Sequence, residues 1–499
     1  MPTPFEIQTL EGSIFDFERA ALILPIFQGG PAGANEERAD AALGGLLTEM
    51  REQRELRPEP GQVLVIPTLG RLPAPRLALV GLGSRESCSR PVVVRAVAAA
   101  CRALGKRGLA EAAIDAADLP LGPDAAGAAA AEGAELSRFI ADLYRTGERK
   151  EVQLRTLYAA GTSDSALRDG AARGRAKNFA RELTVEPGNV VDPPELARRA
   201  EAMAAATGLQ FECLDEAAMQ RLGMEAILTV TRGSETPACF ILLRHFPAGK
   251  RREGTPLLAL IGKAVTFDTG GISLKPVAEM GRMKGDMAGG AAVIGAMQAI
   301  AELRVDLDVL ALVPAAVNMP DGRAWKPGDV VKTRDGLTVE TITTDAEGRM
   351  LLADALSYAR ELGATHLVDI ATLTGACVVG LGHHASGLFS TDPALCEAVR
   401  ECGEEAGERH WPLPLFPEYR EQIRSEIADL KNSGGRPGGA ITAAMFLKEF
   451  AGDLPWAHVD IAGTSHYEKA RPWAPAGPTG IGVGTFVNLA QCLAAGELR

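Results

Sequence analysis

The sequence is short of aromatic residues, of positive charge and of long apolar runs. Aromatics make up only 5% of the 499 residues, so the cores must consist mainly of Ala, Val, Leu and Ile. The formal net charge of -12 argues against nucleic acid as the default partner, because binding to a phosphate backbone normally requires a basic face. No apolar run reaches the roughly 18 residues of a membrane-spanning helix, so no membrane partner is expected.

Signals for export and for disulfide formation are missing as well. The first residues, MPTPFEIQTL, lack the basic and apolar regions of a signal peptide, which predicts a cytoplasmic protein. The eight cysteines are scattered and form no CxxC pair. This pattern predicts reduced, mostly buried thiols rather than a disulfide framework or a zinc ribbon.

Common nucleotide and zinc motifs are also lacking. An apolar run ends in Gly81-Leu82-Gly83, but Glu86 occupies the place of the third glycine of a dinucleotide-binding turn. We therefore interpret this segment as a plain strand-to-helix turn. The chain contains neither a P-loop nor the HExxH pattern of many zinc proteases.

The sequence does contain a regular alternation of apolar runs and helical stretches. Residues 164–189 are typical of one long helix interrupted near Pro187, which puts a domain boundary near residue 170 and predicts domains at 1–165 and 175–499. The Ala- and Gly-rich segment 121–135 is expected in a loop or a helix end. The second domain combines four predicted strands with two predicted helices: strands at 257–263, 308–316, 366–372 and 457–463, helices at 288–303 and 349–362. This predicts an α/β fold with a mostly parallel, mixed sheet sandwiched by helices.

The segment TTDAEGRML, residues 343–351, places Asp345, Glu347 and Arg349 at intervals of two. β-Branched residues precede it and apolar residues follow it at helical spacing, so we expect a strand-to-helix turn at the edge of the sheet where ligands bind. Taken alone, this pattern favours Asp345 as a helix cap and Glu347 as a partner of the helix dipole.

A second segment, residues 260–290, changes that interpretation. Lys263 ends an apolar strand, and Asp268, Lys275 and Asp286 follow it among glycines. Together with Asp345 and Glu347, the acids would form a group of four carboxylates, which repel one another unless cations neutralise them. Two divalent metal ions in such an oxygen-rich site could activate a water and polarise a carbonyl.

Four motifs together resemble the leucyl aminopeptidases of peptidase family M17, the cytosol aminopeptidases. They are GKAVTFDTGGISLKP, MKGDMAGGAAV, TTDAEGRMLLADAL and DIATLTGACVVGLGHHASG. The resemblance is dense from about residue 175 onwards, whereas residues 1–165 resemble the family's N-terminal α/β domain only in length and pattern. It implies an N-terminal domain with an oligomerisation or regulatory role and a larger catalytic domain.

The resemblance also implies a ligand set for two metal ions, Mn²⁺ or Zn²⁺, with Mg²⁺ and Co²⁺ as alternatives. Asp268 and Glu347 would bridge both ions. Asp286 and Lys263 would complete one site, and Asp345 the other. A lysine ligand must be neutral, which requires burial and neighbouring cations to lower its pKa.

Further roles follow from the same resemblance. Lys275 would stay charged and stabilise the developing oxyanion, and Arg349 would hold a bicarbonate ion that acts as general base. Met283, Thr372 and Gly375 would surround the first side chain of the peptide, in an apolar pocket that suits Leu. The expected activity is release of N-terminal amino acids from small peptides by a homohexamer.

The chain departs from the family pattern at a few positions. Thr343 stands where Asn is usual, Met350 where Leu is usual, and Val317 precedes Asn318-Met319-Pro320 where Glu is common. None of these is a predicted ligand. Two alternatives remain open from the residues alone: a dimetal phosphoesterase, and an additional nucleic-acid-binding role of the N-terminal domain.

Overall fold

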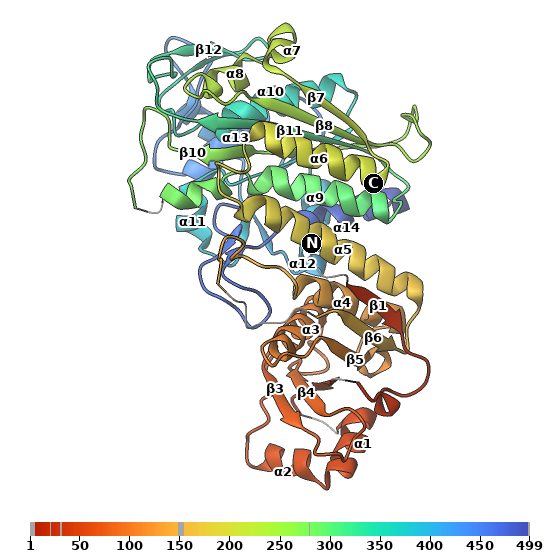
Figure 1. The fold of residues 1–499 in the computed structure, drawn as a ribbon. Coiled ribbons are helices and arrows are strands. Elements are labelled where there is room, and N and C mark those ends of the chain that lie inside the picture. Colours follow the sequence, from red (N-terminus) through yellow and green to blue (C-terminus); the bar gives the residue numbers. More distant parts are fainter. Residues whose placement is uncertain (1–4, 20, 30–31, 148–153, 279, 498–499) are drawn as a thin grey trace. The chain divides into compact units, whose positions relative to one another are not determined.

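Two compact units divide the chain in a computed structural model, which describes residues 5–19, 21–29, 32–147, 154–278 and 280–497 (Figure 1). The first unit comprises residues 1–178 and 467–477, and the second comprises 179–466 and 478–499. The predicted α/β fold with two parts is confirmed, and the sheet of the larger part is mostly parallel. The proposed domain limits, 1–165 and 175–499, stay a prediction.

The first unit is built on a six-stranded sheet of order β1-β6-β5-β2-β4-β3, parallel except for the β3–β4 pair. Its strands are β1 (Glu6–Thr9), β2 (Leu22–Ile26), β3 (Val63–Pro67), β4 (Arg76–Gly81), β5 (Glu111–Asp115) and β6 (Thr156–Ala160). Its helices are η1 (Ile14–Asp16), α1 (Ala34–Leu43), α2 (Leu46–Glu52), α3 (Arg90–Gly105), η2 (Ala116–Asp118) and α4 (Pro123–Leu136). Two separate cores, one beneath α3 and α4 and one beneath α1 and α2, show that helices cover both faces of this sheet.

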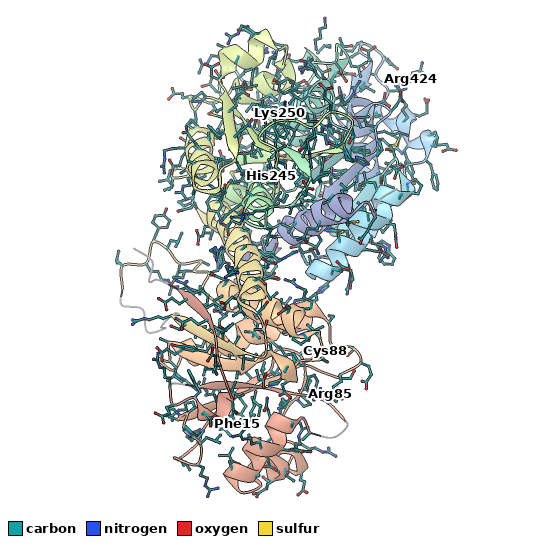
Figure 2. All side chains as sticks on the ribbon, turned by 90° about the vertical axis from the view of Figure 1, so that its right-hand side faces the viewer. Phe15, Arg85, Cys88, His245, Lys250 and Arg424 are labelled. Atoms are coloured by element: carbon teal, nitrogen blue, oxygen red, sulfur yellow. The ribbon has the colours of Figure 1, made fainter. Side chains whose placement is uncertain are left out.

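Two segments of this unit, residues 121–135 and the turn at residues 81–83, can be compared with their predicted structures. The segment 121–135 is not a loop: it forms most of helix α4, because its alanines pack against α3. The Gly81-Leu82-Gly83 turn leads through a loop that carries Arg85 and Cys88 to α3, as a strand-to-helix connection does (Figure 2). The Arg85 guanidinium lies 4.0 Å from the ring centroid of Phe27.

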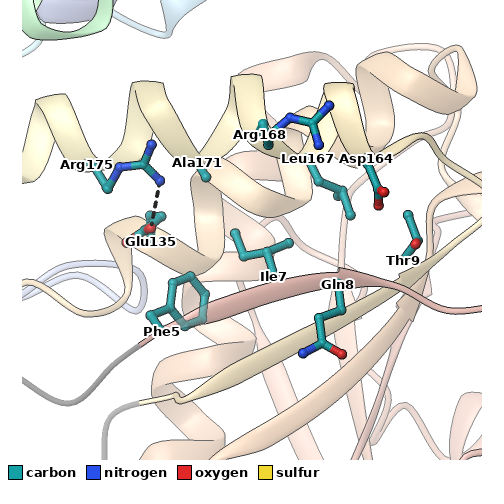
Figure 3. Close-up of a pocket in the computed structure, with 10 residues that line it drawn as sticks. All are labelled: Phe5, Ile7, Gln8, Thr9, Glu135, Asp164, Leu167, Arg168, Ala171 and Arg175. Atoms are coloured by element: carbon teal, nitrogen blue, oxygen red, sulfur yellow. Dashed lines mark ion pairs between the residues drawn. The ribbon is translucent and has the colours of Figure 1, made fainter. Parts of the chain in front are cut away.

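A cavity of about 550 Å³ lies between β1, α4 and the first half of α5 (Asp164–Val185) (Figure 3). Its lining is mixed: the side chains of Ile7 and Leu167 are apolar, whereas Arg168 and Asp164 are charged. The helix α5 itself confirms the long helix predicted at 164–189, and the division between the two units falls within it.

The second unit contains a nine-stranded mixed sheet of order β16-β15-β18-β14-β9-β11-β8-β7, with β10 paired to β11. Its strands are β7 (Gln210–Leu214), β8 (Cys239–His245), β9 (Leu257–Gly262), β10 (Ala264–Asp268), β11 (Asp308–Asn318), β14 (His366–Ala371), β15 (Ser386–Ser390), β16 (His410–Pro412) and β18 (Trp456–Asp460). The central strands β18, β14, β9 and β11 are parallel. All four strands predicted from sequence are therefore present.

Helices cover both faces of this sheet (Figure 1). One layer contains α6 (Pro193–Thr207), α9 (Ala288–Glu302), α12 (Pro393–Ala406) and α14 (Val483–Ala495). The other contains α8 (Glu225–Thr231), α10 (Gly348–Glu361) and α13 (Gly439–Ala451). Shorter elements complete the unit: α7 (Glu216–Arg221), η3 (Met280–Gly285), β12 (Val330–Lys332), β13 (Thr338–Glu340), α11 (Gly375–Leu381), η4 (Pro417–Ile423) and β17 (Leu430–Lys431). The paired strands β19 (His466–Tyr467) and β20 (Gly477–Pro478) stand at the limits between the two units.

The eight cysteines are all free thiols, as predicted, but the expectation that most are buried is wrong. Only Cys101, Cys377 and Cys402 are buried, and Cys213 is exposed on the edge strand β7. Among the described residues no helix is long and apolar enough to cross a membrane.

Helix α9 approaches the sheet closely because glycines stand at the contact. A Cβ atom added to Gly289 would lie 2.3 Å from the carbonyl oxygen of Ile370 on β14. Main-chain atoms cannot yield as a flexible side chain can, so only glycine fits at this position.

We predict that Gly289→Ala destabilises the second unit by about 1–3 kcal/mol, since it forces α9 away from β14. Urea unfolding followed by tryptophan fluorescence measures this, because Trp325 and Trp456 are almost fully buried in that unit. Gly322→Ala is the matched control: no atom lies within 4 Å of its added Cβ, so an unchanged midpoint is expected. Equal midpoints for both variants would contradict the packing argument.

Candidate metal centre

The candidate site lies where parallel strands of the larger sheet end. Lys263 directly follows β9, Asp268 is the last residue of β10, and Thr372 directly follows β14. Asp286 stands two residues before α9. The carboxyl ends of parallel strands meet at one edge of a sheet, which explains why these residues come together.

Asp345 and Glu347 also lie in this site, but the segment that carries them is not the one predicted. They do not follow a strand of the large sheet: the preceding strand, β13, belongs to a three-stranded sheet with β12 and β17. The turn 341–347 then carries the chain to α10, which begins at Gly348. The site is thus shared between the edge of one sheet and the start of a helix.

The capping interpretation of Asp345 is wrong. The residue at the N-cap position of α10 is Glu347, and its side chain makes no capping hydrogen bond. The Glu347 carboxylate instead lies 2.8 Å from the Lys263 ammonium. Asp345 is two positions further back, and its amide donates to the Thr343 hydroxyl at 3.2 Å.

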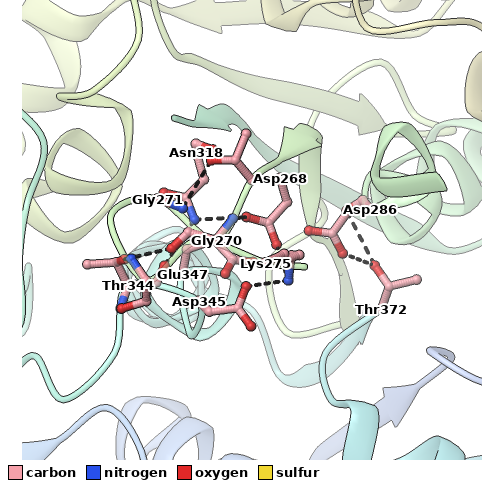
Figure 4. Close-up of polar contacts among 12 residues, drawn as sticks. Asp268, Gly270, Gly271, Lys275, Asp286, Asn318, Thr344, Asp345, Glu347 and Thr372 are labelled. Carbon is pink, nitrogen blue, oxygen red and sulfur yellow. Dashed lines mark hydrogen bonds and ion pairs between the residues drawn. The ribbon is translucent and has the colours of Figure 1, made fainter. Parts of the chain in front are cut away.

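Three buried carboxylates form the centre of the site: Asp268, Asp286 and Glu347 each offer an oxygen within 4.8 Å of the others (Figure 4). The Lys263 Nζ atom lies between two of them, 2.8 Å from Asp286 Oδ2 and 2.8 Å from Glu347 Oε1. The second oxygen of Glu347, Oε2, is buried and has no hydrogen-bond partner. A buried anionic oxygen without a hydrogen-bond partner is suited to bind a cation.

Lys275 links this group to the fourth acid. Its Nζ atom lies 2.8 Å from Asp268 Oδ2 and forms an ion pair with Asp345. The Asp345 side chain is 39% exposed, so it stands at the rim of the site rather than in its interior. The structure therefore brings all five predicted metal ligands and Lys275 together.

Of the four acids, Glu347 is the one whose pKa is lowered, because attraction to Lys263 and Lys275 outweighs the effect of burial. Burial, followed by repulsion from neighbouring acids, raises the pKa of Asp286 to about 8 and that of Asp268 to about 6. Burial also raises the pKa of Asp345. Burial alone would lower the pKa of Lys263, but attraction to Asp286 and Glu347 outweighs it and raises that pKa. Four acids and two lysines leave a deficit that divalent cations could fill.

Neutral polar groups fix the orientation of the acids. Asp268 Oδ1 accepts hydrogen bonds from Asn318 Nδ2 and from the Gly270 amide, both at 2.8 Å. The Thr372 hydroxyl donates to Asp286 Oδ1 at 2.6 Å, and the Thr372 carbonyl accepts from Lys263 Nζ at 3.0 Å. These contacts hold carboxylates that would otherwise repel one another.

Arg349 lies in the first turn of α10 and is buried. Its Nη1 atom donates to the carbonyl of Asn432 at 2.7 Å, whereas its Nε atom is buried without a partner. Burial lowers the pKa of Arg349 to about 10. An unpartnered guanidinium N–H offers a donor for a small oxyanion.

The three residues predicted for the substrate pocket have different surroundings. Thr372 contacts the carboxylate cluster directly through Asp286. Met283 lies in η3 and is half-buried, and its carbonyl accepts the Asp286 amide at 3.2 Å. Gly375 is exposed at the first position of α11.

Two of the three departures from the family pattern, Thr343 and Met350, have structural roles. Thr343 bonds Asp345 through its hydroxyl, and Met350 is fully buried in the core beneath α10. Three buried polar residues were missed: Asn318, Asn432 and Asp460, each with 0% of its surface exposed. Asn318 could have been found, since it ends an apolar strand parallel to β10, but the contacts of Asn432 and Asp460 depend on loop geometry.

Comparison with known proteins agrees with this geometry. Residues 178–487 match the family model described as "Cytosol aminopeptidase family, catalytic domain", and residues 23–148 match that of the family's N-terminal domain. A probable cytosol aminopeptidase of Solibacter usitatus is 46% identical over 481 residues, which cover 95% of this chain and 96% of that protein. One from Alkaliphilus metalliredigens is 43% identical over 469 residues, covering 91% and 92%.

Solved structures of similar proteins share the fold. A mutant of tomato leucine aminopeptidase superposes with a TM-score of 0.88 at 31% identity, covering 98% of this chain and 97% of its own. The bottromycin maturation enzyme BotP in complex with Mn superposes with a TM-score of 0.83 at 34% identity, covering 96% and 99%. The chain therefore belongs to the cytosol aminopeptidase family, peptidase family M17, and is a metal-dependent aminopeptidase.

Proposed function

We propose that the protein releases N-terminal amino acids, preferably leucine and other apolar residues, from small peptides with the help of two divalent metal ions. The observation that carries this proposal is the buried group of Asp268, Asp286 and Glu347, in which one carboxylate oxygen lacks any partner. Oxygen-rich donor sets suit hard and borderline divalent ions. BotP, a similar structure, is described in complex with Mn, which supports Mn²⁺, with Zn²⁺, Mg²⁺ and Co²⁺ as alternatives.

The metal ligands proposed are those that the motifs predict. Asp268 and Glu347 would bridge the two ions, Asp286 and Lys263 would complete one site, and Asp345 the other. Bound there, the ions would supply Lewis-acid chemistry that polarises a peptide carbonyl and makes a water more acidic. Lys263 would have to give up the proton that now pairs it with Asp286 and Glu347, and nearby divalent charge favours that loss.

Lys275 would act as the charged group that stabilises the developing oxyanion. Its pKa is raised, since attraction to Asp268, Glu347 and Asp345 outweighs the effect of burial, so it stays protonated at neutral pH. Arg349 would hold the bicarbonate ion that the family resemblance implies, a group whose chemistry is that of a general base. The buried Nε of Arg349, which has no hydrogen-bond partner, supports an oxyanion there.

Other proposals concern the substrate and the assembly. Met283, Thr372 and Gly375 would surround the first side chain of the peptide, and the free amino group would mark its end.

We further infer a cytoplasmic homohexamer in which residues 1–165 contribute to oligomerisation or regulation and residues 175–499 form the catalytic domain. No observation favours a phosphoesterase or a nucleic-acid-binding role.

We predict that Glu347→Ala abolishes hydrolysis of leucine p-nitroanilide, because it removes the carboxylate proposed to bridge both ions. Circular dichroism should show that the variant still folds. Glu421→Ala is the control, since this glutamate is 74% exposed and its ion pair with Arg424 is long, at 3.8 Å. Full activity of Glu347→Ala would rule out the proposed metal ligands.

Metal removal provides a second test. We expect protein treated with a chelator to be inactive and to recover when Mn²⁺ or Zn²⁺ is added back, with about two ions bound per chain by metal analysis. Assays with leucine amide and with a phosphate ester under the same conditions separate the peptidase from the phosphoesterase. Turnover of leucine amide without metal would contradict the mechanism.

A third test separates chemistry from metal binding. Lys275→Met keeps the length of the side chain but removes the charge, so we predict that kcat falls on the order of 10²–10³-fold while two ions still bind. Steady-state kinetics and metal titration measure the two quantities. An unchanged kcat would mean that Lys275 does not stabilise the oxyanion.

A further inference from the structure

Asn432 is a fully buried polar residue that no metal or substrate role accounts for. It directly follows strand β17 and has 0% of its surface exposed. Its side-chain oxygen accepts the amides of Ile342 at 2.8 Å and Thr343 at 3.4 Å, and its Nδ2 donates to the Thr343 carbonyl at 2.7 Å. The Asn432 side chain thus makes three hydrogen bonds to the backbone of Ile342 and Thr343, the residues that lead into the turn with Asp345.

The main chain of the same residue contacts residues on both sides of that turn. Its carbonyl accepts Nη1 of Arg349 at 2.7 Å, and its amide donates to the Glu340 carbonyl at 2.9 Å. Asp345 and Glu347 lie between the two anchored ends. Asn432 therefore contacts the chain on both sides of Asp345 and Glu347.

The two acids depend on this anchor to different degrees. Glu347 stands at the start of α10 and is held by the Lys263 ion pair, 2.8 Å away. Asp345 lies in irregular backbone, and its amide is bound to the hydroxyl of Thr343, the residue that Asn432 holds at both its amide and its carbonyl. Loss of the Asn432 side chain should therefore displace Asp345 more than Glu347.

We propose that Asn432 is a positioning residue that fixes the 342–345 backbone so that Asp345 is held ready for one of the two metal ions. The proposal rests on the proposed function, because it assumes that Asp345 is a metal ligand. Residues that orient metal ligands typically change metal affinity by about 10–100-fold when they are mutated. Because Asp345 would serve only one of the ions, the loss should fall on one site.

The chain offers a matched set of variants. Asn432→Ala removes all three side-chain hydrogen bonds but keeps the carbonyl that binds Arg349. Asn432→Asp keeps an acceptor for the Ile342 and Thr343 amides, but it replaces the donor to the Thr343 carbonyl by an oxygen and adds a negative charge. Asp429→Ala is the control, since Asp429 clamps the other end of the same strand pair through the amide and hydroxyl of Thr338, at 2.8 and 2.7 Å.

Two measurements on the full chain decide the question. Calorimetric titration of the metal-free protein with Mn²⁺ should show one site weakened about 10–100-fold in Asn432→Ala, less in Asn432→Asp, and neither site weakened in Asp429→Ala. Hydrogen exchange of the metal-free protein should show faster exchange at the Ile342 and Thr343 amides in Asn432→Ala only. Excess Mn²⁺ should restore activity to Asn432→Ala.

The outcomes separate this inference from the proposed function. Two sites in the wild type that persist unchanged in both Asn432 variants would overturn the inference alone. Equal weakening of both sites, or equal effects in Asp429→Ala, would also overturn it, because the cause would then be general loosening of the β13–β17 pair. A wild-type protein that binds no Mn²⁺ would overturn the proposed function and the inference together, and if Asn432→Ala does not fold, Asn432→Asp alone decides.

Discussion

Electrostatic repulsion among buried acids is the constraint on which the rest of the site depends. Asp268, Asp286 and Glu347 offer oxygens within 4.8 Å of one another, with Asp345 joined to them through Lys275. Such a group is stable only if positive charge is supplied, and two lysines do not balance four carboxylates. Burial, with repulsion from neighbouring acids, raises the pKa values of Asp268 and Asp286, and Oε2 of Glu347 has no hydrogen-bond partner. Bound metal ions, on which the family depends, would supply the positive charge that these carboxylates require.

The fold meets this constraint by combining close packing with buried amides. Parallel strands deliver Lys263 and Asp268 to one sheet edge, and glycines allow the helices to come near. At Gly348 an added Cβ would lie 2.6 Å from the Lys263 side chain, so a larger residue at position 348 would displace the lysine that pairs with Glu347. Asn318 fixes Asp268, and the side chain of Asn432 fixes the backbone next to Asp345. Neutral amides suit this task, since they add hydrogen bonds without adding charge.

The sequence predicted secondary structure correctly where the apolar residues form long continuous runs, and incorrectly where a segment's composition fits more than one structure. The apolar runs at 257–263 and 366–372 are strands, because continuous burial on both faces leaves a clear signal. The Ala-rich segment 121–135 was expected in a loop or a helix end, yet it forms most of α4, because alanine is the best helix former and its small side chain lets α4 pack tightly on α3. Asp345 has the composition of a helix cap, but the helix begins three residues later, and a cap is defined by backbone geometry that composition does not encode.

By itself, the sequence determined the α/β class, the family and the identity of the acids and lysines, because spacing along the chain and hydrophobic period are local properties. Only the tertiary structure decided how these residues meet. It placed the Asp345 turn after a separate three-stranded sheet, left one oxygen of Glu347 without a partner, and set Asn432 against a segment 89 residues away. Contacts over such separations arise from the packing of whole elements. No local pattern in the chain specifies them, and this is why candidate ligands could be named from the sequence but the contacts of Asn432 could not.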